Sequence, residues 1–334
     1  MERIHTIPDF HHEILQYNED YIILSKEGGI KLIDGNTFKV KWEEKINGVL
    51  LFYPVLFRDI FYASTVDTFL YSFDLENQTL LHQGDQNLFF STRNQYNELV
   101  LAKSYLIEEK KSYSGLFDLN EFRFTLKKEL KTGRIFELVG NMIIHAGISR
   151  DFEINSMDLL GIHRWTVNLC DELDNKEINR TRFIGPHDND LIFSAESVNC
   201  NYFIAINRYY GTIVNYISSK GLSLPVVEPY SAFLYNGYVC ALNNDQFIEL
   251  NLNTWKLTCF ENKKLNVGFY KFQDGRIFYI NMRSNQVGEY SIEQKDVIWL
   301  IDVETNNKAF ITNLTFMDSA LFMTDSSNNL HVFK

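Results

Sequence analysis

The sequence contains few of the residues that mark disulfide scaffolds, flexible linkers or membrane spans. It has 334 residues with four cysteines, five prolines and 17 glycines. No run approaches the roughly 18 apolar residues of a spanning helix, and the first residues lack the apolar core of a signal peptide. The cysteines, at positions 170, 200, 240 and 259, show no Cys-x-x-Cys spacing. This pattern predicts reduced thiols in a cytoplasmic protein with no membrane segment.

Positive charge is also scarce. The chain carries 32 Lys and Arg against 43 Asp and Glu, which gives a net charge of -11. Nucleic-acid binding needs clustered basic side chains against the phosphates, so this balance argues against a nucleic-acid partner. An acidic surface suits solubility and, as one option, a basic protein partner.

Catalytic and metal-binding motifs are missing as well. The sequence has no Gly-x-Ser-x-Gly elbow, His-Glu-x-x-His pair, P-loop or Gly-x-Gly-x-x-Gly loop. The eight histidines are scattered, and only His11 and His12 are adjacent. His145 lies in an apolar run, where a hydrogen-bonded core histidine is expected. Asp188, Asn189 and Asp190 lack the glycine and glutamate that complete a calcium loop. We therefore predict no catalytic residue, no metal site and no cofactor.

Strand-forming residues, by contrast, are abundant and arranged in a repeat. Aromatic residues make up 15% of the chain, with 27 Phe and 18 Tyr. A short apolar run typical of a strand buried on both faces recurs eight times. The eight runs are 21–25, 60–64, 99–103, 142–146, 191–195, 238–242, 277–281 and 321–325.

Each run is followed by a second strand that usually ends in an apolar residue and then Asp or Asn. Short polar side chains of this kind bond to the backbone just ahead and favour a turn. Six units carry the pair, the seventh has Ile292 and Glu293, and the eighth stops at Lys334. The spacing is about 43 residues per unit, typical of propeller blades. A tryptophan follows the turn in four units, where it is expected to cover the seam between neighbours: Trp42, Trp165, Trp255 and Trp299.

These patterns predict one all-β domain over residues 1–334, a closed β-propeller of about eight four-stranded blades, with seven as the alternative. The eighth unit lacks an outermost strand, and residues 2–7 form a spare apolar-alternating segment. The N-terminal segment is therefore expected to complete the last blade, which would leave few free sheet edges.

Residues 30–42, Ile-Lys-Leu-Ile-Asp-Gly-Asn-Thr-Phe-Lys-Val-Lys-Trp, resemble a quinoprotein-type (PQQ-like) propeller repeat, with Asp34 in the turn and Trp42 downstream. The match is partial at 157–165 and 250–255. The resemblance implies the propeller architecture without a particular function, because the superfamily includes enzymes, assembly factors and binding proteins. Its enzymes imply a quinone, a calcium ion and often a vicinal cysteine pair. This chain has no Cys-Cys pair, which favours the non-enzymatic branch.

The units lengthen in the middle of the chain, and we expect long loops there. The candidate loops are 103–114, 147–155 and 196–202, with long linkers at 170–182 and 218–229. Insertions on a rigid repeat scaffold tend to carry recognition, so these segments are expected to lie together as one binding surface. The predicted partner-binding residues are Glu108, Glu109, Lys111, Tyr113, Arg150, Asp151, Phe152, Asp171, Glu172, Asp174 and Tyr202.

The sequence thus favours a non-catalytic protein-binding module. One alternative within that class is an immunity or inhibitor protein that neutralises a toxin or enzyme. The alternative from another class is a propeller enzyme, or a protein that binds a small molecule, sugar or quinone in its central channel. A stoichiometric protein partner would favour the first class, and a small molecule retained through purification would favour the other.

Overall fold

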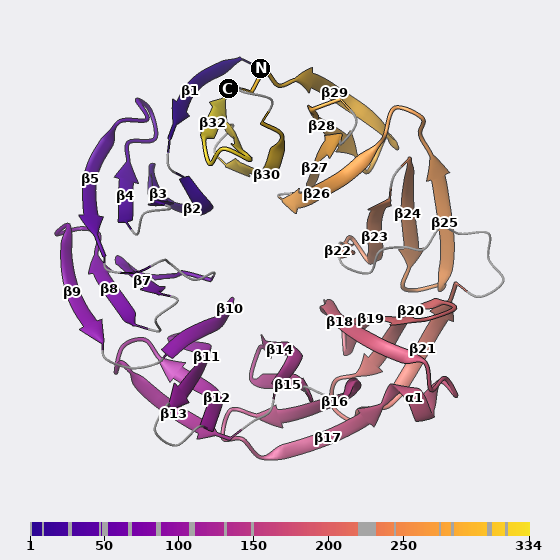
Figure 1. Ribbon diagram of the computed structural model, residues 1–334. Helices are drawn as coiled ribbons and strands as arrows, with labels where there is room; N and C mark the ends of the chain where they lie inside the picture. The colour runs from indigo at the N-terminus through magenta and orange to yellow at the C-terminus, as the bar shows by residue number, and fades with distance from the viewer. Residues whose placement is uncertain are drawn as a thin grey trace. The chain divides into compact units, whose positions relative to one another are not determined.

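The chain folds as a β-propeller of eight four-stranded antiparallel blades in a computed structural model (Figure 1). Neighbouring strands in each blade follow one another along the chain, except in the last blade. The structure describes residues 2–8, 10–25, 29–46, 48, 53–65, 69–84, 88–106, 111–129, 132–147, 150–219, 232–243, 245–273, 275–281, 284–305, 309–317 and 320–334. The chain divides into two compact units, Met1–Phe52 with Ser231–Lys334, and Tyr53–Tyr230. The single-domain assignment stays a prediction.

The first unit holds blades 1, 6, 7 and 8. Blade 1 consists of β2 (Phe10–Tyr17), β3 (Asp20–Ser25), β4 (Gly29–Ile33) and β5 (Val40–Lys45). Blade 6 consists of β22 (Phe233–Tyr235), β23 (Tyr238–Asn243), β24 (Gln246–Asn251) and β25 (Lys256–Glu261). Blade 7 consists of β26 (Val267–Gln273), β27 (Arg276–Asn281), β28 (Gln286–Ser291) and β29 (Asp296–Asp302). Blade 8 consists of β30 (Ile311–Met317), β31 (Ala320–Asp325), β32 (Leu330–Phe333) and β1 (Arg3–Ile7).

The second unit holds blades 2 to 5. Blade 2 consists of β6 (Val55–Phe57), β7 (Ile60–Ser64), β8 (Leu70–Asp74) and β9 (Thr79–Gly84). Blade 3 consists of β10 (Leu88–Tyr96), β11 (Leu99–Leu106), β12 (Lys111–Asp118) and β13 (Arg123–Lys128). Blade 4 consists of β14 (Thr132–Val139), β15 (Met142–Gly147), β16 (Arg150–Asp158) and β17 (His163–Asn168), followed by helix α1 (Leu169–Glu172). Blade 5 consists of β18 (Ile178–His187), β19 (Asp190–Ser197), β20 (Asn201–Asn207) and β21 (Ile213–Ser218).

The eight recurring apolar runs form strands, as predicted. Each run is the second strand of its blade, and the strand that follows it is the third. Each run is buried on both faces; Ile22 and Ile23 of β3, for example, lie on opposite faces and are 0% and 1% exposed. Within each unit, hydrophobic clusters fill the seams between consecutive blades, such as the cluster of Ile144, Trp165 and Phe193 between blades 4 and 5. Burial on both faces explains why these runs are apolar throughout instead of alternating.

The N-terminal strand completes the last blade, as predicted. β1 pairs antiparallel with β32, with Ile7 opposite Leu330 and Thr6 opposite His331. The backbone of Glu2 exchanges hydrogen bonds with that of Lys334, at 2.9 and 3.1 Å. The two chain ends are thus joined in one sheet, and the free edge of β32 is covered.

The predicted turn chemistry is present between the third and fourth strands. Asp34 Oδ1 accepts from the backbone N–H of Thr37 at 2.7 Å, and Asp118 Oδ1 accepts from that of Glu121 at 2.8 Å. In blade 7 the residue with this role is Ser291, whose Oγ accepts from Gln294 N. The prediction of Glu293 as the turn residue was therefore wrong by two positions. A serine hydroxyl makes the same local bond as a carboxylate, more weakly.

The tryptophans share a position less strictly than predicted. Trp42, Trp165 and Trp299 lie in fourth strands, but Trp255 lies in the preceding turn with a φ of 53°. Trp165 covers a seam: it is 6% exposed, and its Nε1 donates to the carbonyl of Arg208 in the next blade at 2.9 Å. Trp299 also packs against the core between blades 7 and 8, and its Nε1 donates to Glu289 of its own blade.

Candidate functional site

The segment 103–114 is mostly strand, so the expectation of a long loop there was wrong. β11 and β12 pair continuously from Lys103 opposite Ser114 to Leu106 opposite Lys111. Lys111 is exposed, with its Nζ 4.0 Å from Glu129 Oε2. Tyr113 is half-buried, and Lys127 Nζ lies 4.6 Å from its ring centre. Glu108 and Glu109 lie outside the described residues.

The segments 147–155 and 196–202 are also largely strand. Arg150, Asp151 and Phe152 open β16, and the side chains of the first two lie outside the described part of the chain. Phe152 is half-buried against the core between blades 4 and 5. In the other segment, only 198–200 separate β19 from β20. The insertions lengthen hairpins instead of forming loops.

Tyr202 is buried, which corrects its prediction as an exposed anchor. It is 7% exposed and belongs to the same core as Ile204. Its hydroxyl accepts a hydrogen bond from Asn175 Nδ2 at 2.8 Å. Because strand residues alternate between faces, its side chain lies on the core face with that of Ile204. Burial is the main cause that raises the pKa of the Tyr202 hydroxyl.

The linker 170–182 contains an acidic helical turn. Asn168 caps α1 through its Oδ1, which accepts from Cys170 N at 3.1 Å, while Leu169 and Cys170 are buried. Asp171 and Glu172 point outward in the first turn, where carboxylates interact favourably with the helix dipole. Asp174 is exposed as well. Among the predicted partner-binding residues whose side chains the structure describes, these three carboxylates and Lys111 are the exposed ones.

The structure brings two of the predicted segments together. Asn175 of the linker reaches Tyr202, and its Nδ2 also lies 3.3 Å from Ser197 Oγ. Asn199 Nδ2 donates to Glu177 Oε2 at 2.7 Å. The linker 170–182 and the segment 196–202 therefore adjoin, as the prediction of one surface requires. Residues 220–229 of the other linker lie outside the described chain.

Sequence reasoning missed four exposed apolar side chains on the turns before the fourth strands of blades 4 and 5, which together we name the rim patch: Leu160, Ile162, Tyr209 and Tyr210. Their exposures are 78, 61, 56 and 77%. A polar side chain at the start of each turn fixes the turn backbone by hydrogen bonds. Asp158 Oδ1 accepts from the N–H groups of Leu160 and Ile162, and Asn207 Oδ1 accepts from those of Tyr209 and Tyr210. Fixed turns thus present apolar side chains to solvent.

Trp165 follows the first turn in the chain and packs against the second. It lies in β17, directly after the first turn, and its indole contacts the second turn, where it bonds to the Arg208 carbonyl. Gly211 lies against the indole with a φ of +69°, and a Cβ there would come within 2.7 Å of the ring. The turn of Tyr209 and Tyr210 therefore rests on a packed support, and a signal existed in the sequence: two turns that each carry two or more large apolar residues.

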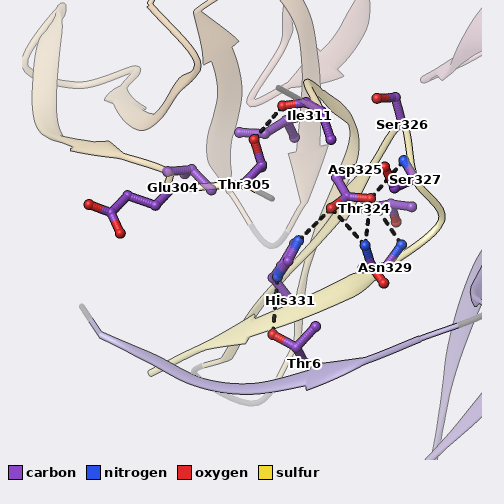
Figure 2. A network of polar contacts seen from close by, with 12 residues as sticks. Thr6, Glu304, Thr305, Ile311, Thr324, Asp325, Ser326, Ser327, Asn329 and His331 are labelled. Atoms are coloured by element: carbon purple, nitrogen blue, oxygen red, sulfur yellow. Dashed lines mark hydrogen bonds and ion pairs between the residues drawn. The ribbon is translucent and has the colours of Figure 1, made fainter. Parts of the chain in front are cut away.

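A second constellation is buried in blade 8 (Figure 2). His331 Nε2 lies 2.9 Å from Asp325 Oδ2, and its Nδ1 lies 3.2 Å from Thr6 Oγ1. Asp325 also accepts from the N–H groups of Ser327 and Asn329. Asp325 and His331 are only 1% and 2% exposed. Burial alone would raise the pKa of Asp325, but these hydrogen bonds hold it below its usual value.

The order hydroxyl, imidazole, carboxylate is that of nucleophilic hydrolases. Catalysis also needs space for a substrate beside the hydroxyl. The cavity at neighbouring Thr324 and Leu330 has a volume of about 10 Å³, too small for one. The arrangement instead links β1, which carries Thr6, to β32 and to the turn after β31. We assign it a structural role.

His145 is half-buried in β15, and its Nδ1 has no hydrogen-bond partner within the described chain. The expectation of a hydrogen-bonded core histidine therefore fails at this atom. Burial is the main cause that lowers its pKa. Among the described residues, no three His, Cys, Asp or Glu side chains gather as metal ligands would, and no helix has the length and apolarity to cross a bilayer.

Comparison with solved structures supports the fold. BamB from Moraxella catarrhalis matches with a TM-score of 0.65 and 14% identity, over 99% of this chain and 98% of that chain. Sqt1 of Saccharomyces cerevisiae matches with a TM-score of 0.60 and 10% identity, over 95% and 93%. The dihydro-heme d1 dehydrogenase NirN, in complex with DHE, matches with a TM-score of 0.64 and 12% identity, over 95% and 74%.

These similarities support the β-propeller fold over nearly the whole chain. At such low identity they show the fold alone, and one of the three is named as a dehydrogenase, so they leave the question of catalysis open. No family model and no curated protein matches the sequence.

Proposed function

We propose that this chain is a non-catalytic protein-binding propeller whose partner docks on the outer edge of blades 4 and 5. The observation that carries the proposal is the rim patch. Four large apolar side chains stand more than half exposed on two turns that the fold holds rigidly. Folding gains nothing from their exposure, whereas clustered apolar and tyrosine side chains are typical anchors of protein interfaces.

The acidic helix extends the same edge. β17 begins beside the first turn of the rim patch and ends at α1. Six strand residues span roughly 20 Å, so one partner surface of ordinary size, about 800 Å² per side, reaches both. The rim patch then supplies the apolar contacts, and Asp171, Glu172 and Asp174 supply the charge.

The charge favours a basic partner. The exposed carboxylates of α1 belong to a chain with a net charge of -11. Such a surface accelerates encounter with a basic protein, and the effect declines as salt is added. An immunity or inhibitor protein that neutralises a basic toxin or enzyme is the specific form that this charge favours. Because the sequence predicts a cytoplasmic protein, the partner is sought there.

Site-specific photo-crosslinking tests the proposal. A benzophenone side chain at position 210 should join the chain to one partner in native extract, and Leu160→Asp should abolish that product. The matched control places the same group at Tyr53, which is 46% exposed in the same unit. A product at position 53 alone, or a small molecule retained by the purified protein in place of a partner, would contradict the proposal.

The charge is tested separately, once a partner is known. Asp171→Lys with Glu172→Lys should slow association several-fold at low salt and have little effect at high salt. Dissociation should change little, because exposed charges act mainly on encounter. An association rate that the two substitutions leave unchanged at low salt would reject the electrostatic part.

A further inference from the structure

A polar pocket lies between blades 6 and 7, in the first unit. Its volume is about 590 Å³. Its polar lining residues are Asp245, Lys263, Lys264, Asn266, Asn281 and Ser284. The volume is within the range of small-molecule sites, roughly 300–1,000 Å³. The wall carries ammonium, carboxamide, hydroxyl and carboxylate groups, and its one apolar residue among those described is Leu265.

One wall is the linker between β25 and β26, and several bonds fix its shape. Asn262 N donates to the carbonyl of Asp245 at 2.7 Å, and Asn262 Oδ1 accepts from Lys264 N at 3.0 Å. The next residue, Leu265, is 2% exposed and packs into the core between the two blades. The backbone that carries the two lysines is therefore held in place.

The opposite wall comes from the end of β27 and the turn that follows. Asn281 is 8% exposed, and its Nδ2 lies 3.4 Å from Gln286 Oε1. Ser284 Oγ donates to the same oxygen at 2.6 Å. Gln286 is itself fixed by a bond from its Nε2 to Asp302 at 2.8 Å. This network positions an amide and a hydroxyl at the pocket before any ligand arrives.

The pocket carries two ammonium groups, and one of them is paired with a carboxylate. Lys264 Nζ lies 3.5 Å from Asp296 Oδ2, outside the lining, and so keeps a defined place. No ion pair to Lys263 is seen in the part of the chain that the structure describes. Asp245 is the one carboxylate among the described lining residues, against two ammonium groups. Asp296 offsets the charge of Lys264, so an anion fits beside Lys263, and lysine is a common partner of phosphate.

We propose that this pocket binds a small phosphorylated polyol, of the size and chemistry of a sugar phosphate. The phosphate lies against Lys263 and Lys264, and the hydroxyl groups bond to Asn266, Asn281 and Ser284. The inference is independent of the proposed protein partner, because the pocket and the rim patch belong to different units.

Titration calorimetry with the full chain tests this site, with glucose 6-phosphate, ribose 5-phosphate and glycerol 3-phosphate as probes. At least one should bind saturably below about 10 mM. Glucose and inorganic phosphate should each bind at least about tenfold more weakly, a loss of roughly 1.4 kcal/mol. If none of the three saturates, the proposal is wrong; if inorganic phosphate binds as tightly as the best probe, the polyol assignment is wrong.

Substitution locates the bound phosphate. Lys263→Ala with Lys264→Ala should weaken the best probe at least tenfold, and Ser284→Ala should weaken it less. Lys176→Ala, an exposed lysine of the other unit, is the matched control and should bind like the wild type. Melting curves establish that each variant is folded. Unchanged binding by the folded double variant would overturn the assignment to this pocket.

Discussion

Blade 8 buries polar side chains, whereas the edge of blades 4 and 5 exposes apolar ones. Blade 8 buries a carboxylate and an imidazole, Asp325 and His331, at 1% and 2% exposure. The edge of blades 4 and 5 exposes large apolar side chains, up to 78% for Leu160. A buried polar group costs free energy unless it is hydrogen-bonded, whereas an exposed apolar group contributes little to folding.

The contrast separates residues that hold the fold from residues that are free to serve a partner. In blade 8 Asp325 bonds to the turn after β31 and to His331 of β32, and His331 bonds in turn to Thr6 of β1. In blades 4 and 5 the bonds of Asp158 and Asn207 fix the turns, while the exposed side chains of the rim patch add little to the stability of the fold. Stability should therefore depend strongly on the first region and hardly at all on the rim patch.

The largest expected effect is that of Asp325→Ala. This change leaves the buried His331 and two partly buried backbone N–H groups without their acceptor, which should cost about 3–5 kcal/mol. The matched control is Asp34→Ala, which removes a carboxylate that bonds Thr37 in the same manner but in an exposed turn. Water replaces those bonds, so the control should cost about 1 kcal/mol. Calorimetric melting measures both, and equal losses would erase the contrast.

Gly211→Ala should be next in size. The substitution forces an alanine to a φ of +69° and brings its Cβ within 2.7 Å of the Trp165 ring, so we expect a loss of about 2–4 kcal/mol. Gly140→Ala is the control, because it has a φ of +56° but its Cβ would meet only Arg208, at 3.8 Å. Strain alone should cost it about 1 kcal/mol. Similar melting temperatures for the two variants would mean that the Trp165 ring shifts at little cost in free energy.

The pH dependence of stability should be smaller and confined to acid. The pKa of Asp325 is lower in the folded chain than its usual value, about 3.9. Its contribution is therefore complete above that value and is lost as pH falls through the lower, folded pKa. Asp325→Asn should remove this part of the slope below about pH 4. Melting curves from pH 2 to 7 compare the two chains; parallel curves would show that folding does not lower the pKa of Asp325.

The repeat was readable from sequence because burial on both faces leaves continuous apolar runs such as Ile22–Leu24. The turn residues, such as Asp34, were readable because their bonds are local. The joining of residues 3–7 to β32 followed from counting strands in the last unit. These features depend on residues close together in the sequence or on the number of strands per unit, so they can be predicted without knowing how the blades pack.

The site was less readable. Residues 103–114 alternate well enough to extend a hairpin, but their polar content resembled a loop. Tyr202 was misplaced because a strand's alternation does not reveal which face meets the next blade. The rim patch was missed because Leu160 and Tyr210 read as ordinary apolar residues until the turns were seen to point them outward. The bond between Thr6 and His331 joins residues 325 positions apart, beyond any local pattern.

The smallest effect on stability should come from the rim patch itself. Leu160→Asp and Tyr210→Asp should each change the free energy of unfolding by less than about 0.5 kcal/mol, because surface substitutions outside packed features are near neutral. Denaturant titration measures this. A loss of 2 kcal/mol or more, roughly that of a core residue, would place these side chains among those that hold the fold.

The most direct measurement is the affinity of the two rim variants for the crosslinked partner, determined by titration beside their melting temperatures. We predict that Leu160→Asp and Tyr210→Asp each weaken binding at least tenfold, about 1.4 kcal/mol, with melting unchanged. Leu81→Asp, on a leucine of blade 2 that is 52% exposed, should bind like the wild type. Wild-type affinity in both rim variants, or equal loss in the Leu81 variant, would contradict the account.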